Sequence, residues 1–562
     1  MVARIFSFLG KEWHNLNEAA MLLGVFAILS QILAVVRDRL FAHYFGAGAT
    51  LDVYYTAFRI PDLLYVSLAS FVSVTVLIPF LLEKIGTGKT GDESSRKFID
   101  DVFTVFFFSI TAISAVLFLF IPRLAHFIAP GFTESQIEAL VTLSRILLLS
   151  PILMGISNLF GSVTQSFRKF FVYALSPVLY NIGIIAGIIF FYPMFGALGL
   201  AWGVVLGALL HLAIQFPVLA SHGFIPRFSF NVDFSSIKQI IAVSLPRTIT
   251  LSLNQLALII IVAIASTLEE GSVSIFNFSY NLQSVPIVII GVSYSVAAFP
   301  SLIKFFSSGN REGFISQIGD AARVIIFWSL PITFLFIVLR AQIVRVLLGS
   351  GAFSWSDTRL TAAMLAIFAV SLIAQNLLPL LIRGYYAAGN TRRPLLVNLF
   401  SYALIIFLSG GLLYLVRQYP EFSYFMENLL RVSDVSGTEA LMLPLAYSIG
   451  SVVNMILLFK IFQKDMAPGL YNSIKRTFFE SFVASFFMGF TAYQFLNVFD
   501  KIFNINTFFG IFFQGLASGL LGIFVGLILL KLLGSRELEE IRQSLHHKFW
   551  KTRAIAPEQE IL

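Results

Sequence analysis

Residues 19–43 read AAMLLGVFAILSQILAVVRDRLFAH, and this stretch decides the fold. It is apolar for long enough to cross about 30 Å of hydrocarbon, which takes roughly 20 residues of helix. It also carries a charged cluster, Arg37-Asp38-Arg39, near its end. Insertion scales penalise an arginine at the centre of a membrane by about 3 kcal/mol, so such charges normally face a partner or a water-filled cavity. The stretch therefore predicts a membrane-spanning helix that carries functional charge.

The rest of the chain has the composition of a membrane protein. Hydrophobic residues make up 57% of its 562 residues and charged residues only 12%, whereas soluble domains have about 25% charged residues. The chain contains no cysteine, which excludes disulfides and thiolate metal sites. It also has no glycine-rich phosphate loop with lysine and no His-Glu-x-x-His pair. We therefore expect a membrane protein that is not an enzyme, with no catalytic residue and no cofactor.

About fourteen apolar stretches reach the length of a membrane span, and none alternates in the ten-residue pattern of a β-barrel. Because only helices or closed barrels cross lipid, the predicted fold class is an all-α polytopic membrane protein with about fourteen transmembrane helices. The predicted spans are 19–43, 52–82, 99–122, 137–164, 171–192, 196–220, 238–266, 273–303, 314–340, 358–386, 395–416, 438–460, 477–497 and 505–533.

The basic residues predict the orientation of the chain. Lysine and arginine gather in the connections that follow even-numbered spans, as at Lys84 and Arg96, at Arg168 and Lys169, and at Arg392. Since cytoplasmic loops carry the excess of such residues, both termini are expected to be cytoplasmic. Topology then explains most of the net charge of +8, and no nucleic-acid partner is expected. The tail after residue 534 is either a helix at the membrane surface or a solvated segment.

An internal repeat relates the two halves of the chain. The segment from Tyr55 to Pro79 parallels the segment from Asn277 to Pro300, at an offset of about 222 residues. An offset of six spans gives both copies the same topology, so they should be related by a pseudo-two-fold axis along the membrane normal and enclose a central cleft. Chance similarity between apolar helices is the alternative. The predicted parts are an N-terminal lobe at 1–222, a second six-helix lobe at 223–464, two further helices at 465–534 and a tail at 535–562.

Several long motifs, in order, give the chain a family resemblance. They include Val36-Arg-Asp-Arg-Leu-Phe-Ala, Asp52-Val-Tyr-Tyr-Thr-Ala-Phe-Arg-Ile-Pro-Asp62, Tyr180-Asn-Ile-Gly and Arg383-Gly-Tyr-Tyr-Ala-Ala-Gly-Asn-Thr-Arg-Arg-Pro394. Together they resemble the MurJ (MviN) lipid II flippases, of the multidrug/oligosaccharidyl-lipid/polysaccharide exporter superfamily. The resemblance implies a monomeric carrier in the bacterial inner membrane. It would move an undecaprenyl-pyrophosphate-linked peptidoglycan precursor to the outer leaflet by alternating access.

The resemblance also implies a cavity in which arginines hold the pyrophosphate. Arg37 matches a family position that contacts it, and Asp38 beside it can neutralise Arg37 when the cavity is empty. Arginine suits this cargo because its planar fork forms paired, charge-assisted bonds with phosphate oxygens. Three other family arginine positions hold Gln31, Tyr65 and Asn281 in this chain.

Other arginines are candidates to replace the missing ones. Arg59, Arg247 and Arg383 lie in predicted spans. The alternative is structural, with Arg59 and Arg383 paired to Asp52, Asp62 or helix-end carbonyls. The predicted cargo site comprises Arg37, Asp38, Arg59, Arg247, Ser30, Gln31, Asn281, Asp52 and Arg383.

The sequence is compatible with several driving forces and several cargoes. Na⁺, H⁺ or the membrane potential could drive transport, and Asn254 and Asn398 are candidate Na⁺ ligands. Asparagines in a helix bundle also form interhelical hydrogen bonds. The altered cavity leaves two alternatives to lipid II transport. One is a carrier of another polyprenyl-linked glycan or of an amphipathic drug, and the other is a membrane scaffold without transport.

Overall fold

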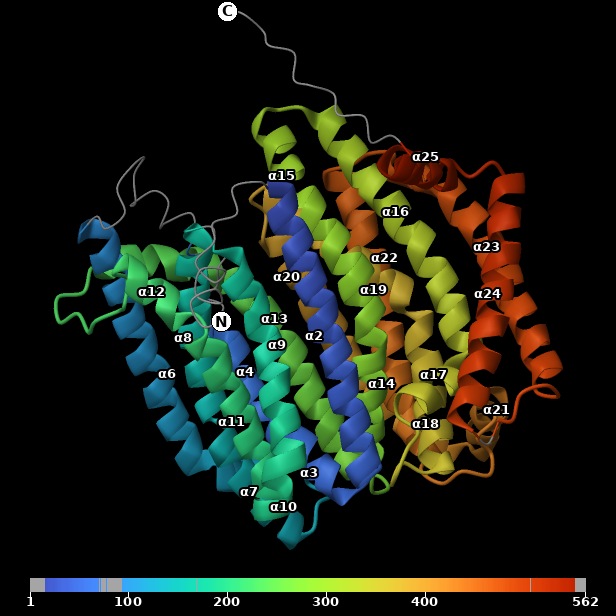
Figure 1. Cartoon of the computed structure of the whole chain (residues 1–562), viewed down its shortest axis with the longest axis horizontal. Coiled ribbons are helices and arrows are strands. Elements are labelled where there is room, and N and C mark those ends of the chain that lie inside the picture. The colour runs from blue at the N-terminus through green and yellow to red at the C-terminus, as the bar shows by residue number, and fades with distance from the viewer. Residues whose placement is uncertain are drawn as a thin grey trace, which may run out of the picture. The chain divides into compact units, whose positions relative to one another are not determined.

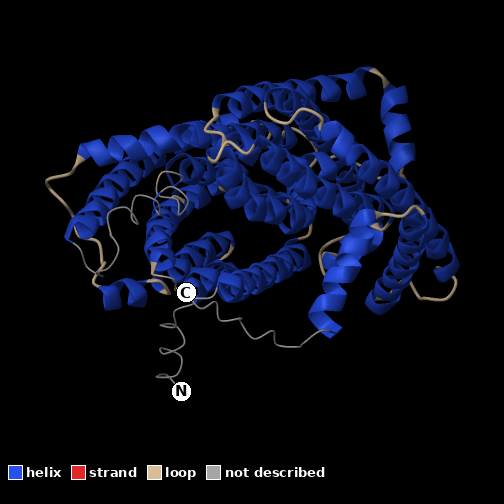
Figure 2. Cartoon of the chain, turned by 90° about the horizontal axis from the view of Figure 1, so that it is seen from above, coloured by secondary structure: helices blue, strands red, loops and turns tan. Residues whose placement is uncertain are grey.

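A computed structural model describes residues 16–69, 71, 77, 93–167, 169–505 and 507–550. Helices and their connections make up all of these residues, with no strand among them (Figure 2). The all-α fold class is therefore confirmed. In chain order, to residue 266, the helices are α2 (Leu16–Phe45), α3 (Ala49–Ala57), α4 (Arg59–Ala69), α6 (Glu93–Ile128), α7 (Glu134–Leu147), α8 (Leu149–Ser166), α9 (Phe170–Ala186), η1 (Gly187–Phe191), α10 (Tyr192–Phe195), α11 (Ala197–Ala213), α12 (Phe216–His222) and α13 (Phe234–Ser266).

The remaining helices continue the same pattern to the C-terminal tail (Figure 1). They are α14 (Ser272–Pro286), η2 (Ile287–Val292), α15 (Ser293–Ser307), α16 (Arg311–Val338), α17 (Arg340–Leu347), α18 (Trp355–Val370), α19 (Leu372–Ala387), α20 (Arg392–Gln418), α21 (Pro420–Leu430), η3 (Thr438–Leu441), α22 (Met442–Asp465), α23 (Leu470–Phe499), α24 (Phe508–Leu532) and α25 (Arg536–Trp550).

The described helices account for most of the predicted spans. Eleven are long and apolar enough to cross a membrane, or twelve if α18 and α19, bent by 46° at their junction, form one span. Helix α2 coincides with the first predicted span, and α3 and α4 form the start of the second. Much of 72–92 lies outside the described residues, so the count of fourteen stays a prediction.

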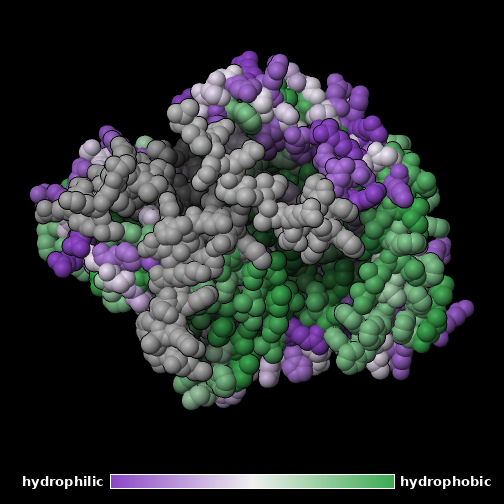
Figure 3. Space-filling model, turned by 45° about the horizontal axis from the view of Figure 1, so that its top comes forward, coloured by the Kyte–Doolittle hydropathy of each residue, from purple (hydrophilic) through white to green (hydrophobic). Residues whose placement is uncertain are grey.

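Apolar side chains remain on the outside of these helices. Phe108, Leu119 and Phe127 of α6 are more than half exposed. Figure 3 shows green, apolar residues over much of its visible surface where residues are described. A soluble protein rarely exposes such large apolar patches, so this surface is the one that lipid covers.

Packing divides the chain into two compact units. The first comprises Met1–Leu282, Leu347–Phe368 and Thr391–Ser451, and the second comprises Gln283–Val346, Ala369–Asn390 and Val452–Leu562. These two units are defined by which residues contact one another in space, whereas the predicted lobes are defined by the repeat in the sequence. The lobe boundaries stay a prediction.

Glycines allow two helices of the first unit to pack closely. Gly183 of α9 lies opposite Gly207 of α11, and a Cβ added at Gly183 would lie 2.2 Å from the Cα of Gly207. Gly187 and Gly203 repeat this contact one turn away. Spacing small residues four apart brings helix backbones together in membranes. Helix α2 packs along α9 in turn (Figure 1), which positions the charged end of α2 against a close-packed pair.

In the second unit a buried carboxylate fastens the C-terminal helix α25. Glu537 is 4% exposed and accepts a 2.6 Å hydrogen bond from the Thr477 hydroxyl of α23. Arg323 of α16 lies 3.6 Å from the same carboxylate and also forms an ion pair with Asp320. The tail therefore begins as a helix docked on the spans of this unit.

Candidate functional site

A cavity of about 270 Å³ lies within the first unit, among α2, α3, α4, α9, α13 and α14. Charged groups, amides and tyrosines form most of its wall. Its polar lining residues are Arg37, Arg59, Asp62, Asn254, Gln255, Asn277, Asn281, Tyr54, Tyr55, Tyr180 and Tyr280. Phe41, Phe58, Ile184 and Leu258 complete the wall.

Arg37 enters the cavity from α2 already engaged with acceptors. Its Nε and Nη2 donate to Oδ1 of Asp38 at 2.9 and 2.8 Å, and its Nη1 donates to Oδ1 of Asn181 at 3.3 Å. Asn281 of α14 donates to the other Asp38 oxygen at 3.0 Å. The structure thus brings Arg37, Asp38 and Asn281 together, and the carboxylate neutralises the arginine.

Asn181 of α9 orients this cluster, although it was not among the predicted site residues. Its Nδ2 donates to the hydroxyl of Ser30 at 3.2 Å and to the carbonyl of Pro177 at 3.1 Å. This leaves its Oδ1 for Arg37. A polar residue in an apolar span is itself a functional signal. Gln31 is half-buried and is not one of the residues that line the cavity.

Arg59, the second cavity arginine, is buried at the start of α4 with 7% exposure. Its Nη2 donates to Oδ1 of Asn277 at 2.5 Å, and the amide of Asn277 is fixed by a 2.7 Å hydrogen bond to the Val273 carbonyl. Arg59 is thus paired with an amide of α14. The structural interpretation of the sequence had paired Arg59 with Asp52, Asp62 or a helix-end carbonyl instead. Asp62 lines the cavity one turn further along α4.

Four polar atoms of lining residues are buried without a hydrogen-bond partner. They are Nε of Arg59, the hydroxyl of Tyr55, Oδ1 of Asn254 and Oε1 of Gln255. Buried polar groups in folded proteins are nearly always paired. The residues that line the cavity therefore include both paired polar groups, as at Arg37, and unpaired ones.

Asp52 stands apart from this lining and caps a helix. Its carboxylate, 4% exposed, accepts hydrogen bonds from the backbone N–H groups of Gly271 at 2.7 Å and Ser274 at 2.8 Å, and from the Ser274 hydroxyl. In return Glu270 accepts from the N–H of Ala49 at the start of α3, at 3.0 Å. Asp52 and Ser274 are 222 residues apart, the offset of the predicted repeat.

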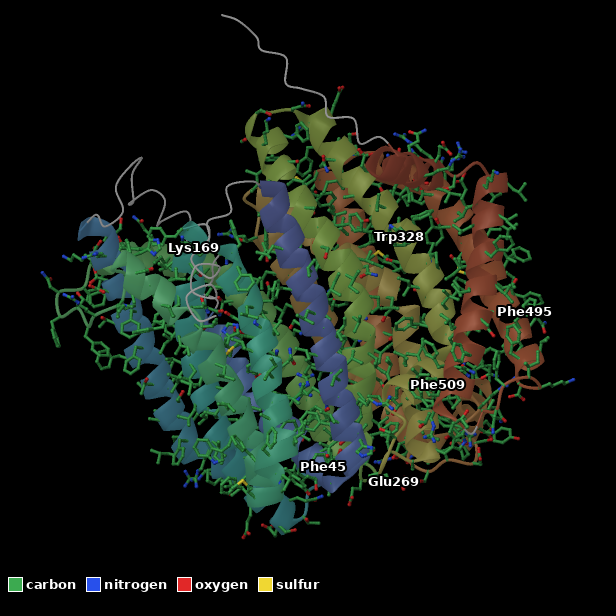
Figure 4. The ribbon with its side chains drawn as sticks, viewed as in Figure 1. Phe45, Lys169, Glu269, Trp328, Phe495 and Phe509 are labelled. Carbon is green, nitrogen blue, oxygen red and sulfur yellow. The ribbon has the colours of Figure 1, made fainter. Side chains whose placement is uncertain are left out.

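The labelled side chains locate this cap within the unit. Phe45, at the end of α2, and Glu269, just before α14, lie at one end of the unit's helices, and Lys169 lies at the opposite end (Figure 4). The cap that joins α3 to α14 is therefore remote from Lys169.

The other predicted residues occupy separate positions. Arg383 of the second unit donates to the hydroxyl of Ser295 at 2.6 Å and to the Val292 carbonyl at 3.2 Å. Tyr65 accepts a 3.0 Å hydrogen bond from Asn158. Asn398 is buried in α20 and is not a lining residue. The side chain of Arg247 lies outside the described residues.

Comparison with known proteins identifies relatives over most of the chain. A family model described as Lipid II flippase MurJ matches residues 41–514. The lipid II flippase MurJ of Burkholderia cenocepacia is 27% identical over 388 residues, 68% of this chain and 75% of that protein. The probable lipid II flippase MurJ of Buchnera aphidicola subsp. Schizaphis graminum is 27% identical over 512 residues, 88% of this chain and 95% of its own.

Solved structures share the fold. A lipid II flippase MurJ in an inward closed conformation superimposes with a TM-score of 0.70 and 22% identity, over 93% of this chain and all of the other. An inward-facing multidrug resistance MATE family transporter of the MOP superfamily gives a TM-score of 0.63 and 15% identity, over 79% of this chain and 96% of the other.

Proposed function

Because the chain belongs to the MurJ family of lipid II flippases, we propose that it translocates lipid II from the inner to the outer leaflet of the bacterial inner membrane. The observation that carries this proposal is the placement of Arg37 and Arg59 on one cavity. A scaffold without transport has no use for two arginines on a shared cavity in a membrane domain, where such charge is costly. A carrier of a pyrophosphate can use both arginines to bind its cargo.

The contacts of Arg37 suggest how cargo is bound and released. Two of its nitrogens donate to a single oxygen of Asp38, so an arriving phosphate offers the same N–H groups an equivalent charged acceptor. Arginine–phosphate bonds are charge-assisted, like the bonds to a carboxylate. Exchange between Asp38 and phosphate keeps the arginine paired throughout. Asn281 holds Asp38 by its other oxygen while Arg37 turns to the cargo.

Three further features belong to the proposal. Alternating access opens the cavity to one leaflet at a time, and both termini lie in the cytoplasm, as the basic connections indicate. Transport is driven by Na⁺, H⁺ or the membrane potential. Asn254 lines the cavity and is the better placed of the two candidate Na⁺ ligands, because Asn398 does not line it. Replacement of Na⁺ by choline during transport distinguishes the first driving force from the others.

A second candidate function is export of another polyprenyl-linked glycan or an amphipathic drug. The cavity residue Asn281 supports it, because this residue occupies a position where the family has arginine and donates to Asp38 as a neutral amide. The cavity is less cationic as a result, which would suit a less charged cargo.

Complementation tests the main proposal. Cells depleted of their own lipid II flippase should regain growth with the wild-type chain and lose it with Arg37→Ala. Arg417→Ala serves as the matched control, because Arg417 forms an exposed ion pair with Glu439 away from the cavity lining. No growth with a wild-type chain that is correctly inserted would overturn the lipid II assignment and favour the second candidate.

A further inference from the structure

A short helix of the first unit, α21, lies in the connection between two membrane spans. It begins two residues after α20 ends. One face of α21 packs on the unit: Met426 is 7% exposed, and Phe422 and Leu430 are partly buried against the same hydrophobic cluster, which includes residues of α13, α14 and α18. Glu427 accepts a 2.7 Å hydrogen bond from the Thr438 hydroxyl. The helix is therefore held in one orientation on the unit.

The opposite face of α21 is apolar and exposed. Tyr424, Phe425 and Leu429 are 65, 59 and 61% exposed. Leaving such side chains in water is unfavourable, since full burial of one is worth about 1.5–3 kcal/mol. An open groove of about 750 Å³ is lined by Tyr424 and Phe425 together with Glu421 and Asn428. This face therefore fits an apolar surface that also offers polar groups.

The exposed face continues the lipid-facing surface of α20. Phe400, Phe407 and Tyr414 of α20 are 55, 73 and 63% exposed, and their spacing of seven residues places them on one side of the helix. Helix α20 has 27 residues and is about 40 Å long, whereas the hydrocarbon is about 30 Å thick. The end of α20 and the start of α21 therefore lie at the boundary between hydrocarbon and water. Tyr414, Tyr419 and Tyr424 follow one another across this junction, and tyrosine is enriched at that boundary.

The charges of α21 favour one class of lipid. Between residues 418 and 430 the sequence has two glutamates and no lysine or arginine. The basic cluster that binds anionic headgroups is thus absent from this segment of the sequence. Glu421 is exposed and lines the groove together with Tyr424. A carboxylate and an aromatic ring both attract an ammonium group, so a zwitterionic lipid complements the groove.

We propose that α21 lies in the membrane interface, with Tyr424, Phe425 and Leu429 inserted among the acyl chains of zwitterionic lipid and Glu421 facing the ammonium headgroup. Helices of this kind bury their apolar face about 5–10 Å deep. With cytoplasmic termini, α20 starts at Arg392 on the cytoplasmic side, and α21 lies in the outer leaflet. The choice of leaflet rests on the orientation given under the proposed function, whereas the contact with lipid does not. Through its buried face, α21 anchors the cluster that includes parts of α13 and α14 to the lipid surface.

Spin labels measure the depth of this face. The chain contains no cysteine, so an introduced cysteine carries the label at a single position. Labels at Phe425→Cys and Leu429→Cys in phosphatidylcholine liposomes should favour collision with oxygen over a water-soluble nickel complex about threefold more than a label at Ser436→Cys, because oxygen concentrates in the bilayer. Ser436 is the matched control, since it is exposed in the loop after α21. Two labelled positions keep the test decisive if one label disturbs the helix.

Two results would overturn the contact with lipid. Nickel contact at Phe425→Cys and Leu429→Cys equal to that at Ser436→Cys would show that the face is solvated. Protection of both positions from oxygen and nickel would assign the face to a protein partner or a second copy of the chain.

Quenching by brominated lipids tests the headgroup. A fluorophore at Leu429→Cys should be quenched about twofold more by brominated phosphatidylcholine than by brominated phosphatidylglycerol with the same acyl chains, because only the first carries an ammonium group. Glu421→Gln should abolish this preference, and Glu312→Gln, an exposed position at the start of α16 in the other unit, should leave it unchanged. Equal quenching by the two lipids, or a preference that survives Glu421→Gln, would overturn the headgroup assignment.

The side of the membrane is measured separately. A membrane-impermeant maleimide should label Ser436→Cys in spheroplasts, and labelling only after lysis would overturn the outer-leaflet assignment. The depth and quenching measurements involve no lipid II. Their failure would therefore leave the proposed transport function standing, whereas failure of lipid II transport with the expected label pattern would leave the interfacial helix standing.

Discussion

Replacing Asp52 with alanine should destabilise the first unit at the start of α14. The carboxylate accepts from the N–H groups of Gly271 and Ser274 at 2.7 and 2.8 Å, in a site where Asp52 is 4% exposed. Leaving a buried donor unpaired costs about 1–3 kcal/mol, whereas loss of an ordinary exposed cap costs about 0.5–2 kcal/mol. The Ser274 hydroxyl can turn to another acceptor, so two unpaired N–H groups give an expected loss of about 2–6 kcal/mol.

The matched control is the reciprocal contact at the same junction. Glu270 accepts from the N–H of Ala49 at 3.0 Å, but this hydrogen bond is exposed, and water can replace the carboxylate. Glu270→Ala should therefore cost less than about 1 kcal/mol. The assay is the free energy of unfolding of the purified chain in mixed micelles, followed by circular dichroism as the denaturing detergent is increased.

Lipid II transport gives a second measurement for comparing Asp52→Ala with Glu270→Ala. Helix α14 carries Asn277 and Asn281, which hold Arg59 and Asp38, so fraying of its first turn should also lower lipid II translocation. Equal stability of Asp52→Ala and wild type would refute the reasoning. So would a larger loss for Glu270→Ala than for Asp52→Ala.

Three other changes give direct checks. Gly207→Ala places a methyl 2.5 Å from the Tyr180 carbonyl oxygen and should lower stability by about 1–3 kcal/mol, whereas Gly410→Ala meets nothing within 4 Å and should leave thermal unfolding unchanged or raise its midpoint. Asn277→Ala leaves a buried guanidinium nitrogen without its acceptor and should cost about 1–3 kcal/mol in the same unfolding assay. Hydrogen bonds from Arg359 lower the pKa of Asp434. These hydrogen bonds therefore stabilise the fold fully above the ordinary aspartate pKa of about 3.9, and their contribution is lost as pH falls through the lowered pKa. The Tm difference between wild type and Asp434→Asn should shrink over that pH interval, and a Tm difference that does not vary with pH would contradict the assignment.

Much of the fold was predictable because membrane spans are set by the length of apolar runs. From residue 95 onward, the spans in the structure coincide with the predicted stretches. The bend between α18 and α19 was not predicted, because the run 358–386 is continuous in hydrophobicity and hydropathy says nothing of helix direction. The division into two packing units was also beyond the sequence, since each unit takes segments from distant parts of the chain.

The candidate site was predictable where its contacts are local. Asp38 is the neighbour of Arg37 in the sequence, so their pairing followed from adjacency. The partner of Arg59 could not be predicted, because Asn277 is 218 residues away and only the fold brings it near. Asp52 looked like a cargo ligand because a carboxylate in a span signals function. Its task as a cap depends on where α14 begins.

Under the proposed function, this chain moves lipid II by way of Arg37. The most direct measurement is the translocation of fluorescent lipid II by the purified chain in liposomes, for wild type and Arg37→Gln at matched incorporation. The account predicts translocation by the wild type and at least a tenfold loss in the variant, because glutamine keeps hydrogen-bonding groups but has no charge for the pyrophosphate. Equal rates in the two proteins would contradict it.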